Sequence, residues 1–373
     1  MSVLIQNLQY VTLPMVIMWI VGGVLIYLAV KKEMEPTLLL PMGFGAILMN
    51  LPVSAEGTGV QHVLNTLFSI GIEGAELFPL MLFIGIGAMI DFQPVLTNPK
   101  LMIFGAAAQF GIFFTLGAAS LLGFELRDAA SIAIIGAADG PTSIFVATEL
   151  GSKYLGAIMV AAYSYMALVP IVQPPIIRLC TTRAERKIKM IYKGKPVSRT
   201  VRILFPILVT VLVGLVAPDA VALIGFLMFG NLIRECGVMN SISETAQKVL
   251  ANLITIFLGL TIASQMRAAE FLKVDTLIII GLGLVAFVFD TVGGILGAKL
   301  MNVFSKEKIN PMIGAAGISA FPMSARVVHK MGLEEDRQNF LLMHSIGVNV
   351  SGQIASVIAG GLILALVKAM IGG

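Results

Sequence analysis

Residues 136 to 145 of this 373-residue chain, GAADGPTSIF, place an acid inside an apolar stretch that runs from about residue 129 to 150. An ionised carboxylate at the centre of a membrane span costs about 2.5 to 3.5 kcal/mol, so Asp139 is expected to have a partner or a function there. Hard oxygen ligands beside it would suit an alkali cation. Backbone carbonyls and hydroxyls for that purpose are supplied by Gly140, Pro141, Thr142 and Ser143.

A structural role for Asp139 stays open at this stage. Proline favours the first turn of a helix and aspartate favours the cap position before it, so Asp139 can cap a helix that restarts at Pro141. The two roles are compatible, because one carboxylate can cap a helix and bind an ion.

A second segment resembles the first. IGAADGPTS begins at Ile135 and IGAAGISAFPMS begins at Ile313, and a charged stretch and a Gly-rich span precede each copy. Gly317 stands where the first copy has its acid. Neutral oxygens in or beside the second copy come from Asn310, Ser319 and Ser324. The alternative to a true repeat is chance similarity between segments rich in small residues, which are common in membrane helices.

Three further residues each allow two interpretations. Arg326 can bind a carboxylate through two parallel hydrogen bonds, or it can be a snorkelling residue of the cytoplasmic surface. Tyr163 and Tyr165 are two positions apart, so they lie on different faces of a helix and only one is expected to face a site. The other interpretation of either tyrosine is membrane-interface anchoring or packing.

Other polar residues in apolar runs are harder to assign. Glu73, Glu76 and Asp290 can be proton-relay groups or packed polar residues whose hydrogen bonds are satisfied. Near the C-terminus a polar patch can join helices by hydrogen bonds or line a path, and it consists of Asn349, Ser351 and Gln353.

Membrane helices must position all of these groups. The hydrophobic share is 57% and the charged share is 12%, whereas soluble domains carry about 25% charged residues. We therefore expect an all-α polytopic membrane protein with about ten transmembrane helices and two re-entrant or broken-helix segments. Apolar runs predict spans near residues 11–30, 37–53, 66–90, 101–123, 154–177, 203–217, 219–234, 249–265, 276–303 and 340–371.

The distribution of lysine and arginine orients these spans. Lys31 and Lys32 follow the first span, and a basic loop at residues 178–202 follows the fifth, so the positive-inside rule places both in the cytoplasm. The segments at 129–150 and 310–323 must then each return to the side from which they enter. The first enters from outside and the second from inside.

This arrangement predicts an inverted-topology repeat. We expect one integral membrane transport domain over residues 1–373, with repeat halves at approximately 66–177 and 249–371. Such repeats build transporters whose site lies at the midplane between two discontinuous helices.

Several function classes receive no support from the sequence. It contains no nucleotide-binding P-loop, dinucleotide fingerprint, HExxH or GxSxG motif, which argues against an ATP-driven pump or a common hydrolase. We also expect no nucleic-acid partner. The energy for transport must come from an ion gradient or from a partner protein.

Three motifs, GAADGPTSIF, SYMALVP and NPMIGAAGISAFPMSARV, resemble the beta subunit of the sodium-transporting, biotin-dependent decarboxylases, which act on oxaloacetate, methylmalonyl-CoA, malonate or glutaconyl-CoA. The similarity covers nearly the whole chain. It favours Tyr165 over Tyr163. Carried over by motif, the resemblance points to Asp139, Tyr165, Asn310, Gly314, Ser319 and Arg326 as functional residues.

The resemblance also implies a reaction and partners. A carboxyltransferase subunit would load carboxybiotin on a separate biotin carrier protein, and this subunit would release CO2, consume a proton from outside and export Na+. A small membrane-anchoring subunit and a homo-oligomer are further expectations, in the cytoplasmic (inner) membrane of a prokaryote. The acid that is decarboxylated is chosen elsewhere in the complex.

These expectations give a mechanistic hypothesis. Asp139 and Asn310 hold one sodium ion, and Tyr165 and Ser319 hold a second, with Gly314 as a further sodium-binding residue. Arg326 orients the carboxylate of carboxybiotin. A sodium ion near Tyr165 favours its phenolate, so that sodium arrival releases a proton. Two rival functions fit the residues: a self-contained sodium/proton exchanger and a purely structural membrane anchor.

Overall fold

The computed structural model describes residues 7–52, 59–74, 76–191 and 196–372, and helices are the regular secondary structure of these ranges. Part of the predicted basic loop, at 192–195, lies outside the described residues. The principal helices are α2 (Leu13–Lys31), α3 (Pro36–Met49), α4 (Val60–Phe68), α5 (Leu77–Met89), α7 (Leu101–Ala108), α8 (Phe110–Leu121), α9 (Leu126–Ala133), α10 (Gly140–Glu149), α11 (Leu155–Cys180), α13 (Arg199–Val216), α14 (Val221–Glu235), α16 (Ala251–Ala263), α18 (Val274–Phe304), α19 (Met323–Glu335) and α20 (Leu342–Met370).

The number of membrane-length helices is lower than the sequence suggests. Within the described ranges, seven helices are long and apolar enough to cross a membrane, or eight if α4 and α5 form one bent span. Two predicted spans fall outside that count because their helices are short: α3 has 14 residues and α14 has 15. A polytopic all-α membrane protein is thus confirmed, whereas a count of about ten is not.

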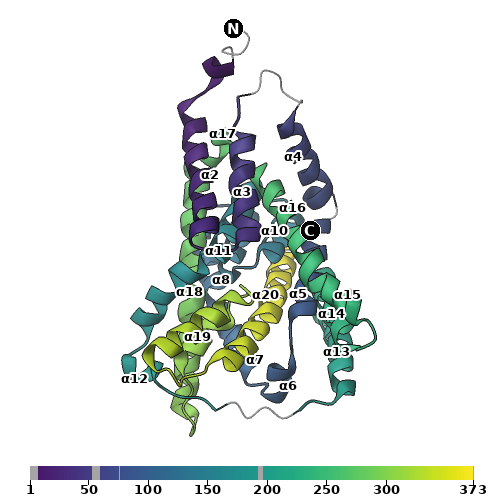
Figure 1. The fold of residues 1–373 in the computed structure, drawn as a ribbon, viewed down its shortest axis with the longest axis vertical. Coiled ribbons are helices and arrows are strands. Elements are labelled where there is room, and N and C mark those ends of the chain that lie inside the picture. The colour runs from purple at the N-terminus through teal and green to yellow at the C-terminus, as the bar shows by residue number, and fades with distance from the viewer. Residues whose placement is uncertain (1–6, 53–58, 75, 192–195, 373) are drawn as a thin grey trace.

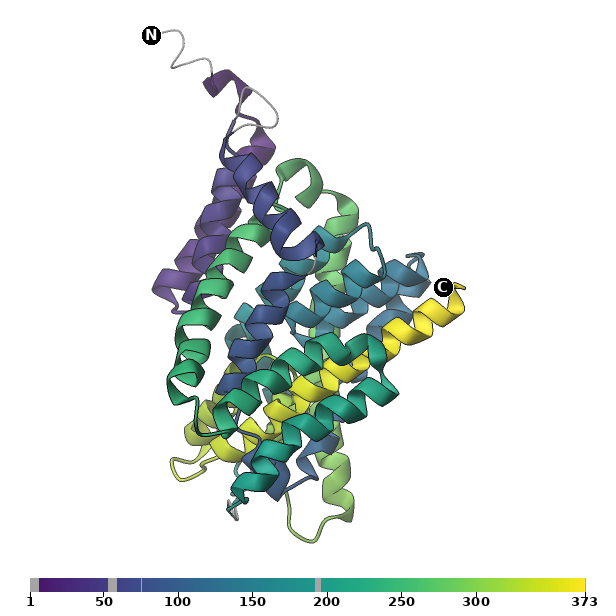
Figure 2. The same cartoon turned by 90° about the vertical axis from the view of Figure 1, so that its right-hand side faces the viewer.

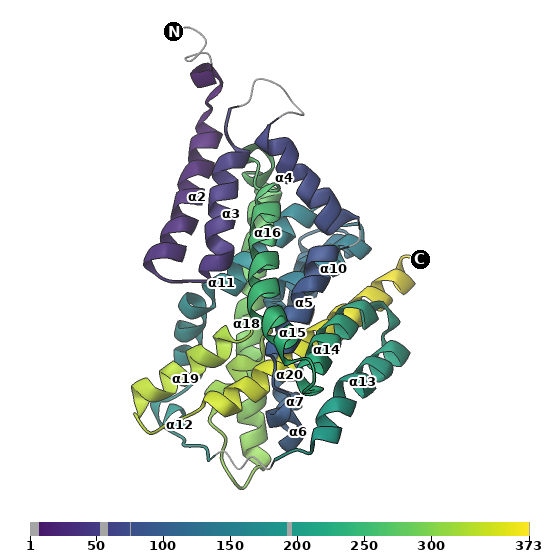
Figure 3. The same ribbon diagram turned by 45° about the vertical axis from the view of Figure 1, so that its right-hand side comes forward.

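Helices α2 and α3 form an antiparallel pair that packs on α16 (Figure 1). Gly22 and Gly43 let the backbones of the pair approach closely, since a Cβ added at either would lie 2.6 Å from the carbonyl oxygen of the other. Figure 3 shows the pair side by side, with α16 next to α3. Small residues at such contacts are typical of membrane helix packing.

Helix α18 runs lengthwise through the molecule, and other segments of the chain contact each of its two ends. Tyr154 at the start of α11 donates a hydrogen bond of 3.0 Å to Asp275 at the first turn of α18. Lys299, near the other end of α18, forms an ion pair of 3.1 Å with Glu185 of the basic loop. The 24 positions between Asp275 and Lys299 correspond to about 36 Å of helix, enough to cross a bilayer.

The first broken segment is a re-entrant hairpin (residues 125–153) that begins and ends at the Asp275 end of α18. Helix α9 enters, a 3-10 turn at η3 (Ile134–Ala137) follows, and α10 returns. The two ends are joined because Ser152 donates a hydrogen bond of 2.7 Å to Asp128 and Lys153 lies 3.6 Å from the same acid. The segment therefore returns to the side it came from, as the sequence predicts.

The second broken segment is a hairpin (residues 310–339) that begins and ends at the opposite end of α18. It consists of the 3-10 helix η6 (Pro311–Gly317), a short break and α19. The Arg186 carbonyl oxygen accepts hydrogen bonds of 2.9 Å from the side-chain amides of both Asn310 and Asn339. The Arg186 guanidinium pairs with Glu335 at 2.7 Å. One residue of the basic loop thus holds both ends of this hairpin.

Replacing Arg186 by glutamine should loosen the second hairpin locally. The guanidinium is largely buried and also donates to the Thr181 carbonyl at 2.6 Å, so its loss should cost about 1 to 2 kcal/mol and increase local opening roughly tenfold. Hydrogen exchange of the amides around Glu335 measures this. Arg183 pairs with the same acid but its side chain is 76% exposed, so Arg183→Gln is the matched control and should change exchange little.

The same ion pair has a defined pH dependence. A hydrogen bond from Arg186 lowers the pKa of the Glu335 carboxyl from its ordinary value of 4.5. The stabilisation is therefore complete above pH 4.5 and is lost as the pH falls through the lowered pKa. Equal exchange rates in the wild type and in Arg186→Gln at neutral pH would contradict this role of Arg186.

The two hairpins meet inside the protein. The backbone N–H of Ser319 in the second break donates a hydrogen bond of 2.9 Å to the carbonyl oxygen of Ala137 in the first. Helix α20 passes this junction obliquely and ends at the C-terminus (Figure 2). Each proposed repeat half contains one of the hairpins. Two breaks that enter from opposite ends and touch at their tips are the geometry that the inverted repeat predicts.

Candidate functional site

Asp139 is the N-cap of α10, as the Pro141 that follows it suggests. Its Oδ1 accepts a hydrogen bond of 3.3 Å from the Thr142 backbone N–H. The side chain is nevertheless not a simple cap, because Oδ2 accepts from the Gln353 amide at 3.1 Å and from the Ser356 hydroxyl at 2.9 Å. Asp139 is 3% exposed, so a buried carboxylate joins the first break to α20.

Ser319 belongs to the same cluster. Its hydroxyl is within hydrogen-bond distance of the Ser356 hydroxyl and lies 3.1 Å from the Gly352 carbonyl oxygen. Ser356 therefore connects the acid of the first break to the hydroxyl of the second. Asp139 and Ser319, which the sequence predicted as sodium ligands, lie one side chain apart.

One face of α20 supplies the remaining groups. Asn349, Gln353 and Ser356 are spaced i, i+4 and i+7, which places them on one side of a helix. Asn349 donates hydrogen bonds to the carbonyls of Ala316 at 3.1 Å and Ile318 at 2.7 Å in the second break. The face thus contacts both breaks.

Several buried oxygens at this junction have no donor. Within the described residues, no hydrogen-bond partner is found for three of them, Thr142 Oγ1, Gln353 Oε1 and Asn349 Oδ1. A buried oxygen without a donor is costly, and a cation would satisfy it. Neutral oxygens around a carboxylate are the ligand type that a hard monovalent cation takes.

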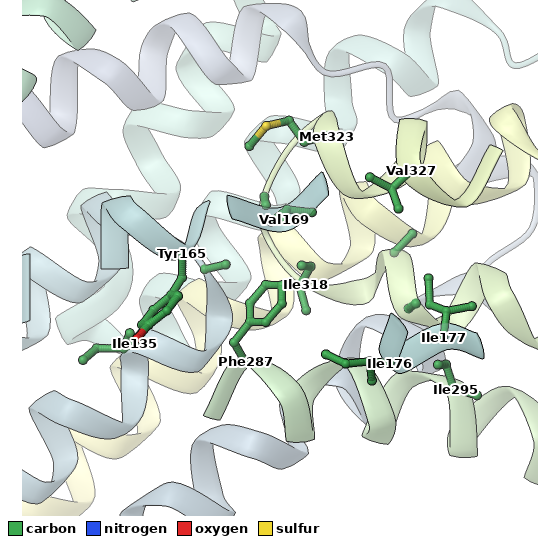
Figure 4. Packing of buried hydrophobic residues seen from close by; sticks show 14 of the residues in the cluster. Ile135, Tyr165, Val169, Ile176, Ile177, Phe287, Ile295, Ile318, Met323 and Val327 are labelled. Carbon is green, nitrogen blue, oxygen red and sulfur yellow. The ribbon is translucent and has the colours of Figure 1, made fainter. Parts of the chain in front are cut away.

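Tyr165 is placed beside the first break but in apolar surroundings. Its ring packs among Ile135, Val169 and Phe287, as Figure 4 shows, and its hydroxyl donates to the Ile280 carbonyl of α18. A Cβ added at Gly283 would lie 2.9 Å from the ring, so α18 packs directly against the ring of Tyr165. No hydrogen bond joins Tyr165 to Asp139 in the described part of the chain.

Tyr163 is the tyrosine that touches the Asp139 segment. A Cβ added at Gly140 would lie 2.2 Å from its ring, so the glycine after Asp139 leaves room for the aromatic side chain. The Tyr163 hydroxyl is buried, and no partner for it is found among the described residues. The sequence correctly places the two tyrosines on different faces, but periodicity alone does not say which face meets Asp139.

Asn310 is not brought to Asp139. Its amide donates to the carbonyls of Arg186 and Ile188, both at 2.9 Å, and its Oδ1 accepts from the Met312 N–H at 3.1 Å. The seven residues of η6, at about 2 Å of rise each, separate it from the break that carries Ser319. In this structure Asn310 caps η6 and attaches it to the basic loop.

The last two predicted residues have different surroundings. Gly314 lies against α18, where an added Cβ would be 2.0 Å from the Gly294 carbonyl oxygen, so it provides close backbone contact. Arg326 is exposed on α19. Burial raises the pKa of Glu35 at the start of α3, and the positive charge of Arg326 partly opposes this rise. Arg326 is thus accessible at the molecular surface.

The sequence did not single out Ser356, and it offered Gln353 only as part of a polar patch. The signal that would have found them is the spacing of Asn349, Gln353 and Ser356 along one face of α20. Asp290, left unassigned above, is fully buried in α18, and its Oδ1 accepts a hydrogen bond of 3.2 Å from the Ile112 N–H. It joins α18 to the first turn of α8.

Comparison with known proteins identifies the family of the chain. The family model described as the Na+-transporting oxaloacetate decarboxylase beta subunit matches residues 14–367. The chain belongs to this family. It is 48% identical to the methylmalonyl-CoA decarboxylase subunit beta of Propionigenium modestum, with 94% of each chain covered. It is 44% identical to the oxaloacetate decarboxylase beta chain of Klebsiella pneumoniae, with 99% of each covered.

Membership of this beta-subunit family confirms the resemblance inferred from the three motifs. It supports a membrane subunit of a sodium-pumping decarboxylase over a self-contained sodium/proton exchanger. The bacterial relatives and the apolar helices support a multi-pass protein of a prokaryotic inner membrane.

Proposed function

We propose that this beta subunit decarboxylates carboxybiotin and exports sodium through the junction of its two hairpins. The observation that carries the proposal is the buried Asp139 carboxylate, whose hydrogen-bond donors in the described part of the chain are all neutral: the Thr142 N–H, the Gln353 amide and the Ser356 hydroxyl. An ionised carboxylate in such a place lacks a counter-charge. Sodium supplies that charge and also satisfies the orphan oxygens around it.

The structure changes which residues we assign to the first ion. Asp139, Ser356 and Ser319 lie in one hydrogen-bonded cluster, so we assign a sodium ion to them, with Gln353 and Thr142 as further oxygen donors. Asn310 is then a residue that holds η6 in place. Because η6 leads directly to Ser319, displacement of Asn310 would also displace a sodium ligand.

Tyr165 remains our candidate for exchanging the consumed proton. Ionisation of a phenol is unfavourable unless a cation is close, so proton loss from Tyr165 should require sodium in the neighbouring junction. Moving one charge against 100 mV takes about 2.3 kcal/mol, and a proton exchanged for sodium reduces the net charge moved.

The chemical step is cleavage of the bond between the carboxyl carbon and the ureido nitrogen of biotin. CO2 leaves, and the nitrogen takes up a proton to regenerate biotin. We propose that carboxybiotin arrives on a separate biotin carrier protein loaded by a carboxyltransferase subunit, with a small membrane-anchoring subunit completing the complex. Several copies of the chain can assemble in it.

Flux measurements on the full-length chain in liposomes test this function. Sodium uptake that requires added carboxybiotin supports the pump. Proton-driven sodium exchange without biotin supports the exchanger instead. A purely structural anchor predicts that changing Asp139 and Arg326 harms only assembly of the complex, which a pull-down with activity measured in parallel tests.

Removing the Ser356 hydroxyl should weaken sodium binding. Ser356→Ala deletes a hydrogen bond to a carboxylate, worth about 1.5 to 3 kcal/mol, so the sodium concentration for half-maximal decarboxylation should rise about 10- to 100-fold. Ser351→Ala is the matched control, because its hydroxyl, also on α20, bonds only to the Leu101 and Val348 carbonyls within the described chain. An unchanged sodium dependence of Ser356→Ala would exclude Ser356 from the site.

A further inference from the structure

A cavity of about 810 Å³ opens at the end of the molecule where the second hairpin begins. Its walls come from the start of α7, the segment after α12 (Arg183–Arg186), and the loop after α18. Four lysines and one glutamate line it: Lys100, Lys189, Lys306, Lys308 and Glu307. We call it the lysine-lined cavity.

The charge of this cavity selects the sign of its ligand. Four ammonium groups against one carboxylate repel sodium, so the lysine-lined cavity is not an entrance for the transported ion. Lys189 is already paired with Asp336 at 3.0 Å, and Lys308 donates to the Asn302 carbonyl at 2.7 Å. Among the described residues, Lys100 and Lys306 have no acidic partner. Two uncompensated cations are therefore available to an anion.

Apolar side chains also line the cavity. Met301 and Ile309 are partly exposed and Phe304 is 81% exposed, so all three can contact a ligand. A cavity lined by both lysines and apolar side chains fits a ligand that combines a carboxylate with an apolar body, and the volume lies within the range of about 300 to 1,000 Å³ that is typical of small-molecule sites. A free inorganic anion would use the lysines but not the apolar side chains.

We propose that the lysine-lined cavity binds the carboxylated head of carboxybiotin, with Lys100 and Lys306 as its carboxylate-binding residues. This inference rests on the proposed function. Ile313 belongs to η6, so one short helix leads from the cavity toward Ser319 and the proposed sodium site. Arg326, which does not line the cavity, is then left for contact with the carrier protein.

The test uses the full-length chain in nanodiscs of zwitterionic phosphatidylcholine and the N-carboxylated methyl ester of biotin. The ester leaves the transferred carboxylate as the only charge on this probe. Lys100→Gln and Lys306→Gln should each raise KM about threefold to fivefold with kcat nearly unchanged, as expected for an exposed ion pair. Lys306→Arg should restore the wild-type KM. Lys330, an exposed lysine outside the cavity, gives the control Lys330→Gln, which should have no effect.

The result that overturns the proposal is an unchanged KM for both cavity variants in an active protein. If the wild-type protein decarboxylates the ester only in the presence of sodium, the proposed function is supported even when the cavity variants have no effect. Failure of the cavity proposal can thus be told apart from failure of the proposed function. A variant effect that appears only in discs containing phosphatidylglycerol would assign the cavity to a lipid phosphate and also overturn the proposal. Potassium chloride screens the charge of Lys306, so added salt should raise the wild-type KM. It should raise the KM of Lys306→Gln less, because this variant lacks the charge.

Discussion

Asp139→Asn should abolish sodium-dependent decarboxylation at ordinary sodium concentrations while leaving the protein folded. Asparagine keeps an oxygen that can accept from the Thr142 N–H, so the cap of α10 survives. What disappears is the charge that pairs with sodium. Breaking a buried ion pair costs about 3 to 5 kcal/mol, which corresponds to at least a 100-fold rise in the sodium concentration needed for half-maximal activity.

Glu125→Gln is the matched control for this change. Glu125 lies at the surface end of the same hairpin, is 74% exposed and contacts Lys153 at 3.7 Å, so its loss should hardly alter sodium dependence. Sodium uptake and decarboxylation are measured on the same proteoliposomes. If Asp139→Asn retains both activities at the wild-type sodium requirement, sodium does not bind at the junction of the hairpins.

The re-entrant hairpins could be predicted because their sequences combine apolar segments with residues that interrupt a membrane helix. Glycine and proline interrupt two apolar segments, and charged residues flank them, so a straight span was excluded. The cap at Asp139 follows from Pro141 for the same local reason. The number of full spans was less accessible, because α3 and α14 are short and because α4 and α5 form a bent pair and not one straight helix.

The composition of the site depended on distant contacts. Gln353 and Ser356 are 214 and 217 residues from Asp139, and only the packing of α20 across both breaks brings them together. Asn310 was expected beside the acid because it has the appropriate oxygen. The length of η6 places it elsewhere, and a residue type carries no information about that distance.

Gly314→Ala should impair the protein through packing rather than through loss of a ligand. The added methyl would lie 2.0 Å from the Gly294 carbonyl oxygen, and alanine at Gly294 would meet the Gly314 carbonyl at 2.1 Å. Overpacking costs about 1 to 3 kcal/mol, and here the obstacle is backbone, which cannot rotate away. Both variants should therefore lower the midpoint of thermal unfolding in detergent and reduce sodium transport severalfold.

Gly281→Ala separates this effect from a general effect of alanine in α18. No atom lies within 4 Å of a Cβ added at Gly281, so this variant should keep its activity and be slightly stabilised by the better helix propensity of alanine. Sodium affinity distinguishes packing from ligation. If Gly314→Ala unfolds at the wild-type temperature but requires much more sodium, its carbonyl is a sodium ligand and the close contact between η6 and α18 is not its role.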